Sequence, residues 1–481
     1  MIKSLKEPMT QNSRKELLIK SLRGRAYVYE LIGENKEAIK DLRIGIEIAK
    51  DMLNTKFEAG CLLQLSTTYS FSSYEKMLHL AKEAQRHFQK IGDKEGEGES
   101  FVNIGYAHYV LGDYKNALKY YEASLKKFKA LNYREGEAAS FNNMGVIFKI
   151  LGNYKSALKY YKNSFKIRKE IGNRLGCAES FNNIGVIYSD IGDYKNALSY
   201  YNKSLKILEE TGCRMGQAYV FTNLGRIFQI LGDNKKALGH YKESLQIVEE
   251  IDDKRAQAVN LRDIGQIYIE SRNYQNGKKY LKDAEVVAKK IGNKEVLRRI
   301  YVSFAELEMT QNNTEKAKEY TEKALNLAEE MDSKSGKAEA LLLLARILNQ
   351  GLLREVKSDK GLSGFGGGTC SADTRWQIAD RRFKEAIKLF EELKQPFELA
   401  KAYYYYAESL LLKAEFGEKN PHPFGKQTRV RGEDNEKEAI RLKTDATEYL
   451  LKSKKIFEKI GTKVWLKKVQ SIWKEIKSRK V

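Results

Sequence analysis

Small and aromatic residues recur along the chain at helical spacing, and the pattern repeats every forty residues. The stretch FNNMG at 141–145 returns as FNNIG at 181–185, with near-copies at 101–105, 221–225 and 261–265. In these copies a large residue (aromatic in four of the five), a glycine and a second aromatic ring (His in the first copy) stand at offsets 0, 4 and 7, which places them on one helical face. After a short gap, alanine, tyrosine and serine show the same spacing in the first four copies. The pattern predicts a first helix and a second helix in each repeat.

The short gaps between these helices carry turn chemistry. The turns read LGDYKNA at 111–117, LGNYKSA at 151–157 and IGDYKNA at 191–197. Glycine ends the first helix in a left-handed conformation, and the following Asp or Asn caps the second helix. Because large residues face small ones, the two helices are expected to interdigitate at close range. The glycine within FNNMG, which costs helix stability by itself, is therefore interpreted as a packing position.

This combination of small and large residues in a helix pair resembles the tetratricopeptide repeat. The period of forty residues is similar to that of the long repeats in spindle-orientation adaptors and kinesin light chains. The resemblance implies an all-α, right-handed α-solenoid of about ten helix pairs, whose first helices line a concave groove. It also implies a function in binding other proteins. Such arrays need a final capping helix to cover the last apolar face.

The repeat frame divides the chain into four segments. Eight repeats fit between about 15 and 332, and the repeats that follow are divergent and interrupted by two polar, Gly- or Pro-containing insertions that are expected to be mobile. A final helix with an apolar stripe that includes Trp465 and Trp473 is expected to pack as a cap against 435–460. The segments are 1–14 (N-terminal), 15–332 (repeats), 333–460 (divergent repeats, insertions at 351–374 and 416–434) and 461–481 (cap and basic tail).

A row of asparagines accompanies the glycines. Each lies two residues before its glycine, and a shift of two residues turns about 200° around a helix, so the row leaves the packed face. We interpret Asn103, Asn143, Asn183 and Asn223, with Asp263 in the fifth place, as a ladder along the concave groove. A carboxamide can bind both N–H and C=O of an extended peptide. The alternative is that these asparagines satisfy the backbone of a neighbouring helix.

Other positions of the expected groove differ from repeat to repeat. Asn142 and Asn182 precede two members of the ladder, whereas Arg226 and Arg262 introduce positive charge. A constant polar row beside a varying row indicates a grip on the main chain of a partner segment combined with sequence-selective contacts. The two arginines favour an acidic segment. The nine positions Asn103, Asn142, Asn143, Asn182, Asn183, Asn223, Arg226, Arg262 and Asp263 are thus the candidate peptide-binding residues.

Composition and motifs indicate no catalytic or cofactor site. The glycines at 361–368 lack the lysine and preceding strand of a phosphate loop, and the five histidines show no metal-ligand spacing. Four scattered cysteines, no run of 18 apolar residues and no apolar leader favour a cytoplasmic protein. We therefore expect a non-enzymatic scaffold or adaptor without a cofactor.

Charge keeps two alternatives open. The chain carries a net charge of +22, of which residues 1–25 contribute +5 and residues 441–481 contribute +9. Nucleic-acid binding through these basic ends would depend steeply on salt. The second alternative is that the array serves as the regulatory arm of a signalling assembly, with a nucleotide cyclase, a kinase or an NTPase as its partner.

Overall fold

The chain folds into helices throughout the part that can be described. A computed structural model describes residues 10–31, 34–69, 73–331, 333–357, 372–393, 395–419, 432–460 and 463–478. Within these ranges there are twenty-one helices and no strand, which confirms the expected all-α class. The chain forms two compact units, Met1–Ser180 and Phe181–Val481, which are described separately below.

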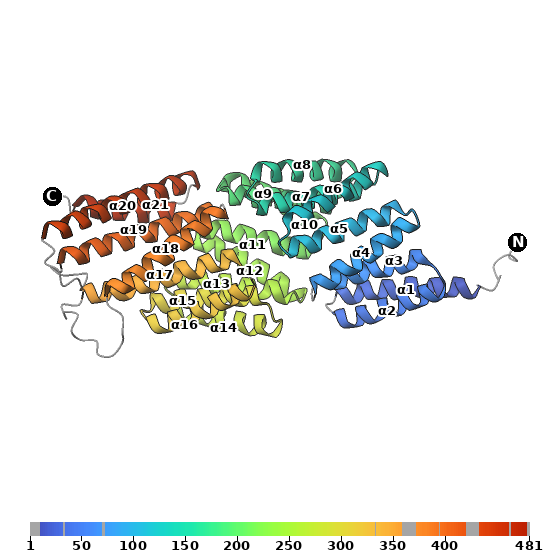
Figure 1. Ribbon diagram of the computed structural model, residues 1–481, viewed down its shortest axis with the longest axis horizontal. Coiled ribbons are helices and arrows are strands. Elements are labelled where there is room, and N and C mark those ends of the chain that lie inside the picture. Colours follow the sequence, from blue (N-terminus) through green and yellow to red (C-terminus); the bar gives the residue numbers. More distant parts are fainter. Residues whose placement is uncertain are drawn as a thin grey trace. The chain divides into compact units, whose positions relative to one another are not determined.

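The first unit consists of four helix pairs and the beginning of a ninth helix (Figure 1). Each first helix contacts its second helix, and each second helix contacts the next first helix up to α7. The helices are α1 (Gln11–Leu31), α2 (Asn35–Asp51), α3 (Thr55–Thr68), α4 (Tyr74–Lys90), α5 (Lys94–Val110), α6 (Tyr114–Ala130), α7 (Arg134–Ile150), α8 (Tyr154–Glu170) and α9 (Arg174–Asp190).

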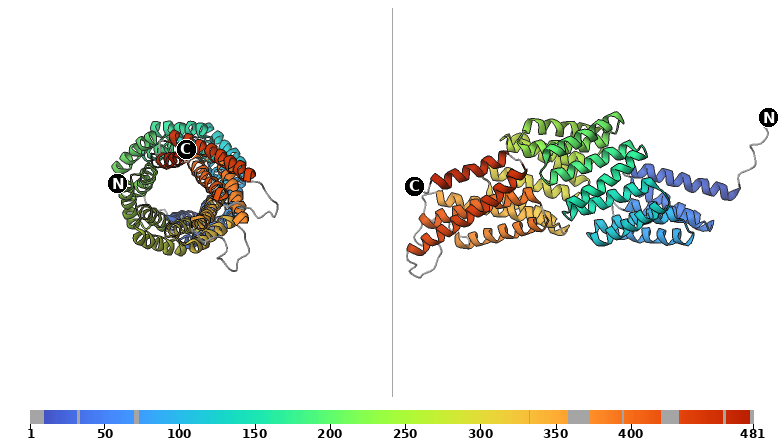
Figure 2. Two further views of the ribbon diagram at one scale, coloured as in Figure 1. Left: turned by 90° about the vertical axis from the view of Figure 1, so that its left-hand side faces the viewer. Right: turned by 90° about the horizontal axis from the view of Figure 1, so that it is seen from above.

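The second unit continues the same alternation, as the two views of Figure 2 also show. Its helices bring the total to the ten expected pairs and one final helix. They are α10 (Tyr194–Glu210), α11 (Arg214–Leu231), α12 (Asn234–Glu250), α13 (Lys254–Glu270), α14 (Tyr274–Lys290), α15 (Lys294–Thr310), α16 (Thr314–Glu330), α17 (Lys334–Lys357), α18 (Ala372–Glu392), α19 (Pro396–Lys419), α20 (Gly432–Ile460) and α21 (Lys463–Ser478).

The repeated glycine of each first helix packs against the repeated tyrosine of its second helix. A Cβ atom on Gly145 would come within 2.7 Å of the Tyr161 ring, and one on Gly225 within 2.8 Å of the Tyr241 ring. These tyrosines are almost completely buried. The absence of a side chain thus lets two helices approach each other, and this gain offsets the intrinsic cost of glycine in a helix. The packing interpretation of the glycines is confirmed.

The turns also have the expected form. Gly112 and Gly232 adopt positive φ angles of 78° and 82°, which only glycine adopts without strain. The side chain of Asp113 then accepts a hydrogen bond from the backbone N–H of Asn116, and Asp233 accepts one from Lys236. The Gly–Asp pair therefore ends one helix and begins the next within a few residues.

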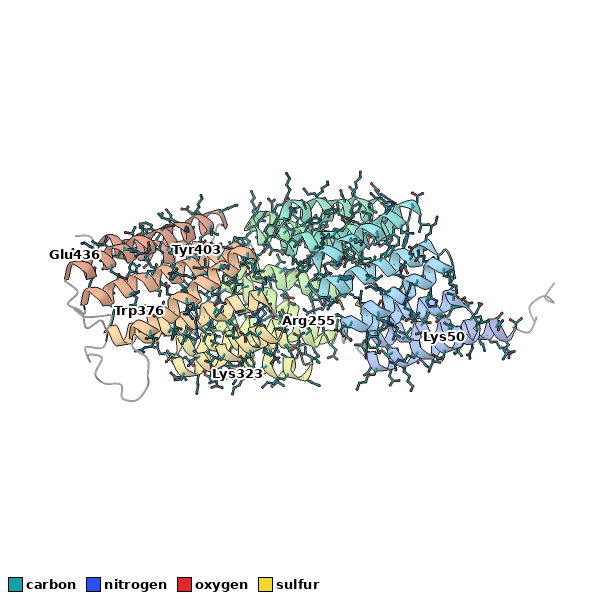
Figure 3. All side chains as sticks on the ribbon, viewed as in Figure 1. Lys50, Arg255, Lys323, Trp376, Tyr403 and Glu436 are labelled. Carbon is teal, nitrogen blue, oxygen red and sulfur yellow. The ribbon has the colours of Figure 1, made fainter. Side chains whose placement is uncertain are left out.

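The last third differs in detail from the sequence prediction. Helix α17 continues to Lys357 and α19 to Lys419, so the predicted insertions at 351–374 and 416–434 begin within helices. Residues 358–371 and 420–431 lie outside the described residues. The mobility expected of the insertions concerns these residues and stays a prediction. Trp376 is buried on α18, and Tyr403 is buried where α19 meets α20 (Figure 3).

The final helix is present and contacts α20, as expected for a cap on 435–460, and it also reaches other helices. The Trp465 ring lies 5.5 Å from Tyr404 and 5.8 Å from Tyr405 on α19, and 5.2 Å from Phe457 on α20. Helix α21 also contacts α11. Val469 is fully buried, whereas Trp465 and Trp473 are only partly buried. The cap therefore packs on α20 and, through Trp465, on the aromatic side chains of α19.

Candidate ligand-binding face

The first helices of the second unit carry one register position, exposed or partly exposed, at intervals of forty residues. Arg226, Gln266, Glu306 and Arg346 occupy this position on α11, α13, α15 and α17, and Tyr405 lies beside Arg346 on α19. We call the surface that carries these five residues the first-helix face. Neighbouring first helices contact each other from α13 to α19, so the face is continuous across repeats.

Polar contacts connect the repeats along this face. Gln266 donates a hydrogen bond of 2.8 Å to Glu306, and Arg346 pairs with the other oxygen of Glu306 at 3.3 Å. The guanidinium carbon of Arg346 lies 4.1 Å from the centroid of the Tyr405 ring. These contacts cross four helices in succession. They hold the side chains in fixed positions, which lowers the entropy cost of binding a ligand.

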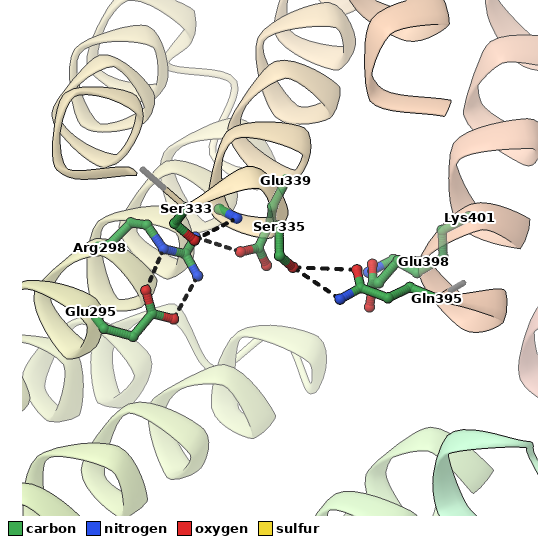
Figure 4. Close-up of polar contacts among 9 residues, drawn as sticks. Glu295, Arg298, Ser333, Ser335, Glu339, Gln395, Glu398 and Lys401 are labelled. Carbon is green, nitrogen blue, oxygen red and sulfur yellow. Dashed lines mark hydrogen bonds and ion pairs between the residues drawn. The ribbon is translucent and has the colours of Figure 1, made fainter. Parts of the chain in front are cut away.

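Ion pairs and hydrogen bonds also connect α15, α17 and the start of α19. Arg298 donates hydrogen bonds to both oxygens of Glu295 and one of 2.7 Å to Glu339, so it joins α15 to α17 (Figure 4). On the next helices, Ser335 and Gln395 exchange hydrogen bonds. Arg298 is 4% exposed, and its buried positive charge is balanced by two carboxylates that are themselves partly exposed.

Three other arginines are less well balanced. Arg226, Arg262 and Arg299 come from the successive first helices α11, α13 and α15, and Arg262 is paired with Asp263. The pKa of Arg299 is lowered to about 10, first by the charge of Arg262 and then by burial, and Arg226 acts in the same direction. The charges of Arg262 and Arg226 thus repel that of Arg299. A negatively charged ligand group would relieve this repulsion.

The candidate asparagines of the first unit have different environments. Asn103 donates hydrogen bonds to the Leu63 carbonyl, Ser66 and Thr67 on the preceding first helix. Asn142 is buried and donates to Glu179. Asn143 makes no side-chain hydrogen bond to the described residues, and its side chain is partly accessible. For Asn103 the structure shows the alternative role, a bond to a neighbouring helix.

In the second unit the asparagines are also engaged. Asn223 donates a hydrogen bond of 3.0 Å to Asn182 on the preceding first helix. Asn183 also interacts with another residue and is not free. Asp263 is buried and bound by Arg262. Of the sequence-predicted residues, the structure thus uses Asn182, Asn223 and Asp263 for internal contacts, and the charge of Asp263 also raises the pKa of Arg226.

Sequence reasoning missed Arg299, Glu306 and Arg346. The forty-residue step from Arg226 through Gln266 leads directly to Glu306 and Arg346, so continuing the row would have identified two of them. Arg299 belongs to a different register and had no such signal. In the described ranges no three metal-ligating side chains come together. None of the described helices has the length and apolar character needed to span a bilayer.

The fold and this face define a helical-repeat protein with a ligand-accessible surface on its first helices. Family models described as tetratricopeptide repeat match residues 136–210 and 215–290, and also 98–126 and 299–331. The chain contains tetratricopeptide repeats within 98–331. A comparison with curated proteins gives no match.

Solved structures show the same fold at low sequence identity. A Rap protein complexed with competence and sporulation factor is 14% identical, with a TM-score of 0.53 over 79% of this chain and 99% of that one. The apo quorum sensor NprR from B. thuringiensis is 14% identical, with a TM-score of 0.53 over 77% and 98%. Apo RapI is 14% identical, with a TM-score of 0.52 over 78% and 98%. At this identity the likeness shows the fold alone.

Proposed function

We propose that the protein is a non-enzymatic scaffold or adaptor that binds a segment of a partner protein on the first-helix face of its second unit. The observation that carries the proposal is the cluster of Arg226, Arg262 and Arg299 beside the fixed side chains of that face. Charged groups held in place on rigid helices are suited to recognition, because little freedom is lost when a ligand binds. Free Cys61, Cys177 and Cys213 are in keeping with a reducing, cytoplasmic location.

The arrangement favours an extended and acidic segment. The face crosses successive first helices, and helices pack about 8–10 Å apart. An extended chain covers about 3.3 Å per residue, so about three residues would separate equivalent contacts on neighbouring repeats. Carboxylates at that spacing would meet the arginines of α11, α13 and α15. Charge-assisted hydrogen bonds to carboxylates are the strongest that such a face can offer.

Fewer asparagines of the row are proposed to contact the ligand than the sequence predicted. Asn143 in the first unit is the member whose carboxamide is available for the main chain of a ligand. Asn103, Asn142 and Asn223 would have to exchange an internal hydrogen bond for one to the ligand. An exchanged bond adds little net free energy, since a hydrogen bond of the same kind is lost. Arginines therefore replace asparagines as the main contacts proposed here.

The test compares two double substitutions. The partner is captured from a lysate of the source cell, and its bound segment is then titrated as a synthetic peptide. Arg226→Gln with Arg299→Gln should weaken binding at least about a hundredfold, because each charged hydrogen bond contributes about 1.5–3 kcal/mol and about 1.4 kcal/mol is a factor of ten. The thermal unfolding midpoint of the same variant should fall little, since removing two like charges also removes repulsion.

The matched control removes the same charge elsewhere in the unit. Lys235→Gln with Lys242→Gln changes two exposed lysines of α12, on the second-helix side. This variant should bind the peptide as the native protein does. If both variants weaken binding equally, the effect comes from overall charge. Unchanged binding in the arginine variant would remove the first-helix face from the proposal.

The identity of the captured partner separates adaptor from regulator. The same face would serve a regulatory arm, and then the captured protein would be a nucleotide cyclase, a kinase or an NTPase. Nucleic-acid binding at the basic ends is the other alternative, and the described structure adds no observation in its favour. A binding constant that falls steeply with salt and ignores the arginine substitutions would identify it.

A further inference from the structure

The second helices of the first unit carry an unusual surplus of positive charge. Helix α6 holds five lysines and one glutamate, a net charge of +4, and α8 holds five lysines, one arginine and one glutamate, a net charge of +5. The corresponding helices of the second unit carry less, with zero on α12, −2 on α16, +1 on α10 and +3 on α14. Helices α6 and α8 thus have the two largest surpluses of positive charge among the second helices.

Helical periodicity places these lysines on one face. Lys155, Lys159, Lys162 and Lys166 stand at offsets 0, 4, 7 and 11 on α8, which is one stripe about 17 Å long at 1.5 Å per residue. The opposite side of α8 holds buried residues, among them Ala157. The stripe therefore points away from the packed interior.

Helix α6 repeats the stripe one repeat earlier. Lys115, Lys119 and Lys126 precede Lys155, Lys159 and Lys166 by forty residues, so they occupy equivalent positions in neighbouring repeats. Helix α7 contacts both α6 and α8 and holds them in adjacent places (Figure 1). We call the two stripes together the lysine surface. It consists of Lys115, Lys119, Lys126, Lys155, Lys159, Lys162 and Lys166.

The lysine surface is open, and it includes one carboxylate, because exposed Glu122 on α6 takes the position that Lys162 has on α8. All seven of its lysines are exposed. None of them forms an ion pair with an acidic side chain in the part of the chain that the structure describes, although other lysines nearby do, such as Lys127 with Glu97. Like charges at this density repel one another and attract a polyanion strongly.

We propose that the lysine surface of the first unit binds the phosphate backbone of a nucleic acid. Lysine ammonium groups pair with phosphates as point charges, and a row of them neutralises a continuous line of phosphates with release of counterions. Such contacts position a nucleic acid without reading its sequence. The site is separate from the first-helix face and from the basic chain ends.

A membrane surface suits the same residues less well. The large apolar side chains that are exposed in the described structure do not belong to α6 or α8, and the nearest ones, Leu111, Leu131, Leu151 and Ile171, lie in turns. Helices that bind bilayers combine basic residues with an apolar face that enters the lipid. On α6 and α8 the apolar face is already buried inside the protein.

The experiment measures binding of a short fluorescent DNA duplex by anisotropy between about 50 and 200 mM salt. A single-stranded RNA probe is run in parallel. The variant Lys155→Gln, Lys159→Gln, Lys166→Gln should lower the slope of log K against log salt by about 2 to 3, since each lost phosphate contact with B-DNA removes about 0.9. The exposed substitutions should leave the thermal unfolding midpoint unchanged.

The control removes three exposed lysines from α14 by Lys279→Gln, Lys282→Gln and Lys290→Gln. Its salt slope should equal that of the native protein. The proposal is overturned if the native protein binds neither probe at low salt, or if the two triple variants lose affinity equally. Binding to vesicles with anionic lipids but to neither nucleic acid would assign the surface to membranes.

Discussion

At the scale of single residues, the repeat depends on pairs in which one partner has almost no side chain. Gly225 meets Tyr241 and Gly145 meets Tyr161, while a buried serine such as Ser244 donates a hydrogen bond of 2.8 Å to the Ala218 carbonyl. Aromatic rings of the two helices also stack, and the ring centroids of Phe148 and Tyr160 lie 5.1 Å apart. The same contacts return in each repeat because the residues return every forty positions.

A matched pair of glycines tests this packing. Gly225→Ala should destabilise the second unit by about 1–3 kcal/mol, since the new methyl group would lie about 2.8 Å from the Tyr241 ring. Gly239 on α12 has no atom near its missing Cβ, so Gly239→Ala should stabilise by up to about 1 kcal/mol. Thermal unfolding of both variants gives the comparison. Two changes of the same sign would contradict the packing role of Gly225.

Cys61 provides a pH-dependent test in the first unit. Burial raises the pKa of its thiol from about 9 to about 11. The thiol must remain neutral in the folded protein, so its contribution is complete below pH 9 and is lost as the pH rises towards 11. The loss is about 1.4 kcal/mol per pH unit in that window. Unfolding midpoints between pH 8 and 11 should fall more steeply for the native protein than for Cys61→Ala, and equal slopes would refute the assignment.

At the scale of elements, α21 is the helix whose placement departs most from the repeat. It follows α20 as a first helix would, yet its Trp465 stacks on Phe457 and meets Tyr404 and Tyr405, and the helix also contacts α11. Lys468 lies in the same region, and burial followed by the charge of Arg346 lowers the pKa of its ammonium group. Apolar contacts hold α21 although like charges oppose it.

A buried carboxylate should release this helix. Val469→Asp places a charge at a fully buried position of α21, and Gln470→Asp places the same residue at an exposed neighbouring position. Only Val469→Asp should shift the tryptophan emission to longer wavelength and lower the unfolding midpoint, because an unpaired buried charge is costly. The loss of stability cannot exceed the free energy with which α21 packs on the rest of the unit. Identical spectra for the two variants would show that α21 does not depend on Val469.

At the scale of the whole molecule, the chain contains two compact units, divided after Ser180 within α9. Repeat arrays gain their stability from neighbouring repeats, so units of different composition can unfold separately. All three tryptophans, Trp376, Trp465 and Trp473, belong to the second unit. Tryptophan fluorescence therefore reports on one unit, whereas helical circular dichroism reports on both.

This distribution of tryptophans predicts that the two signals will not coincide. In a denaturant titration, the fluorescence transition should be single, and the circular dichroism transition should show a further step. Gly225→Ala should move the fluorescence transition to lower denaturant and leave the other step in place. Superimposable transitions in the native protein would indicate that both units unfold together.

The repeat itself could be derived from the sequence, because its elements depend on local chemistry. The forty-residue period predicted ten helix pairs, the Gly–Asp turns predicted their boundaries, and the offsets of glycine and tyrosine predicted which faces meet. Boundaries were less certain where the period failed. At 351–357 and 416–419 the sequence suggested insertions, but helices α17 and α19 continue through them, and the single glycines Gly351 and Gly417 do not end these helices.

The ligand-binding residues could be derived only in part, because their roles depend on distances between repeats. An exposed asparagine at a fixed register looks the same in the sequence whether it binds a ligand or a neighbouring helix. Tertiary contacts decided that Asn103 bonds to α3 and Asn223 to Asn182. They also brought Arg299 beside Arg262, and α21 against α19 and α11, because side chains from separate repeats meet only when the helices are packed. Local periodicity thus determined the helices and their pairing, and packing between repeats decided which polar groups remain available to a partner.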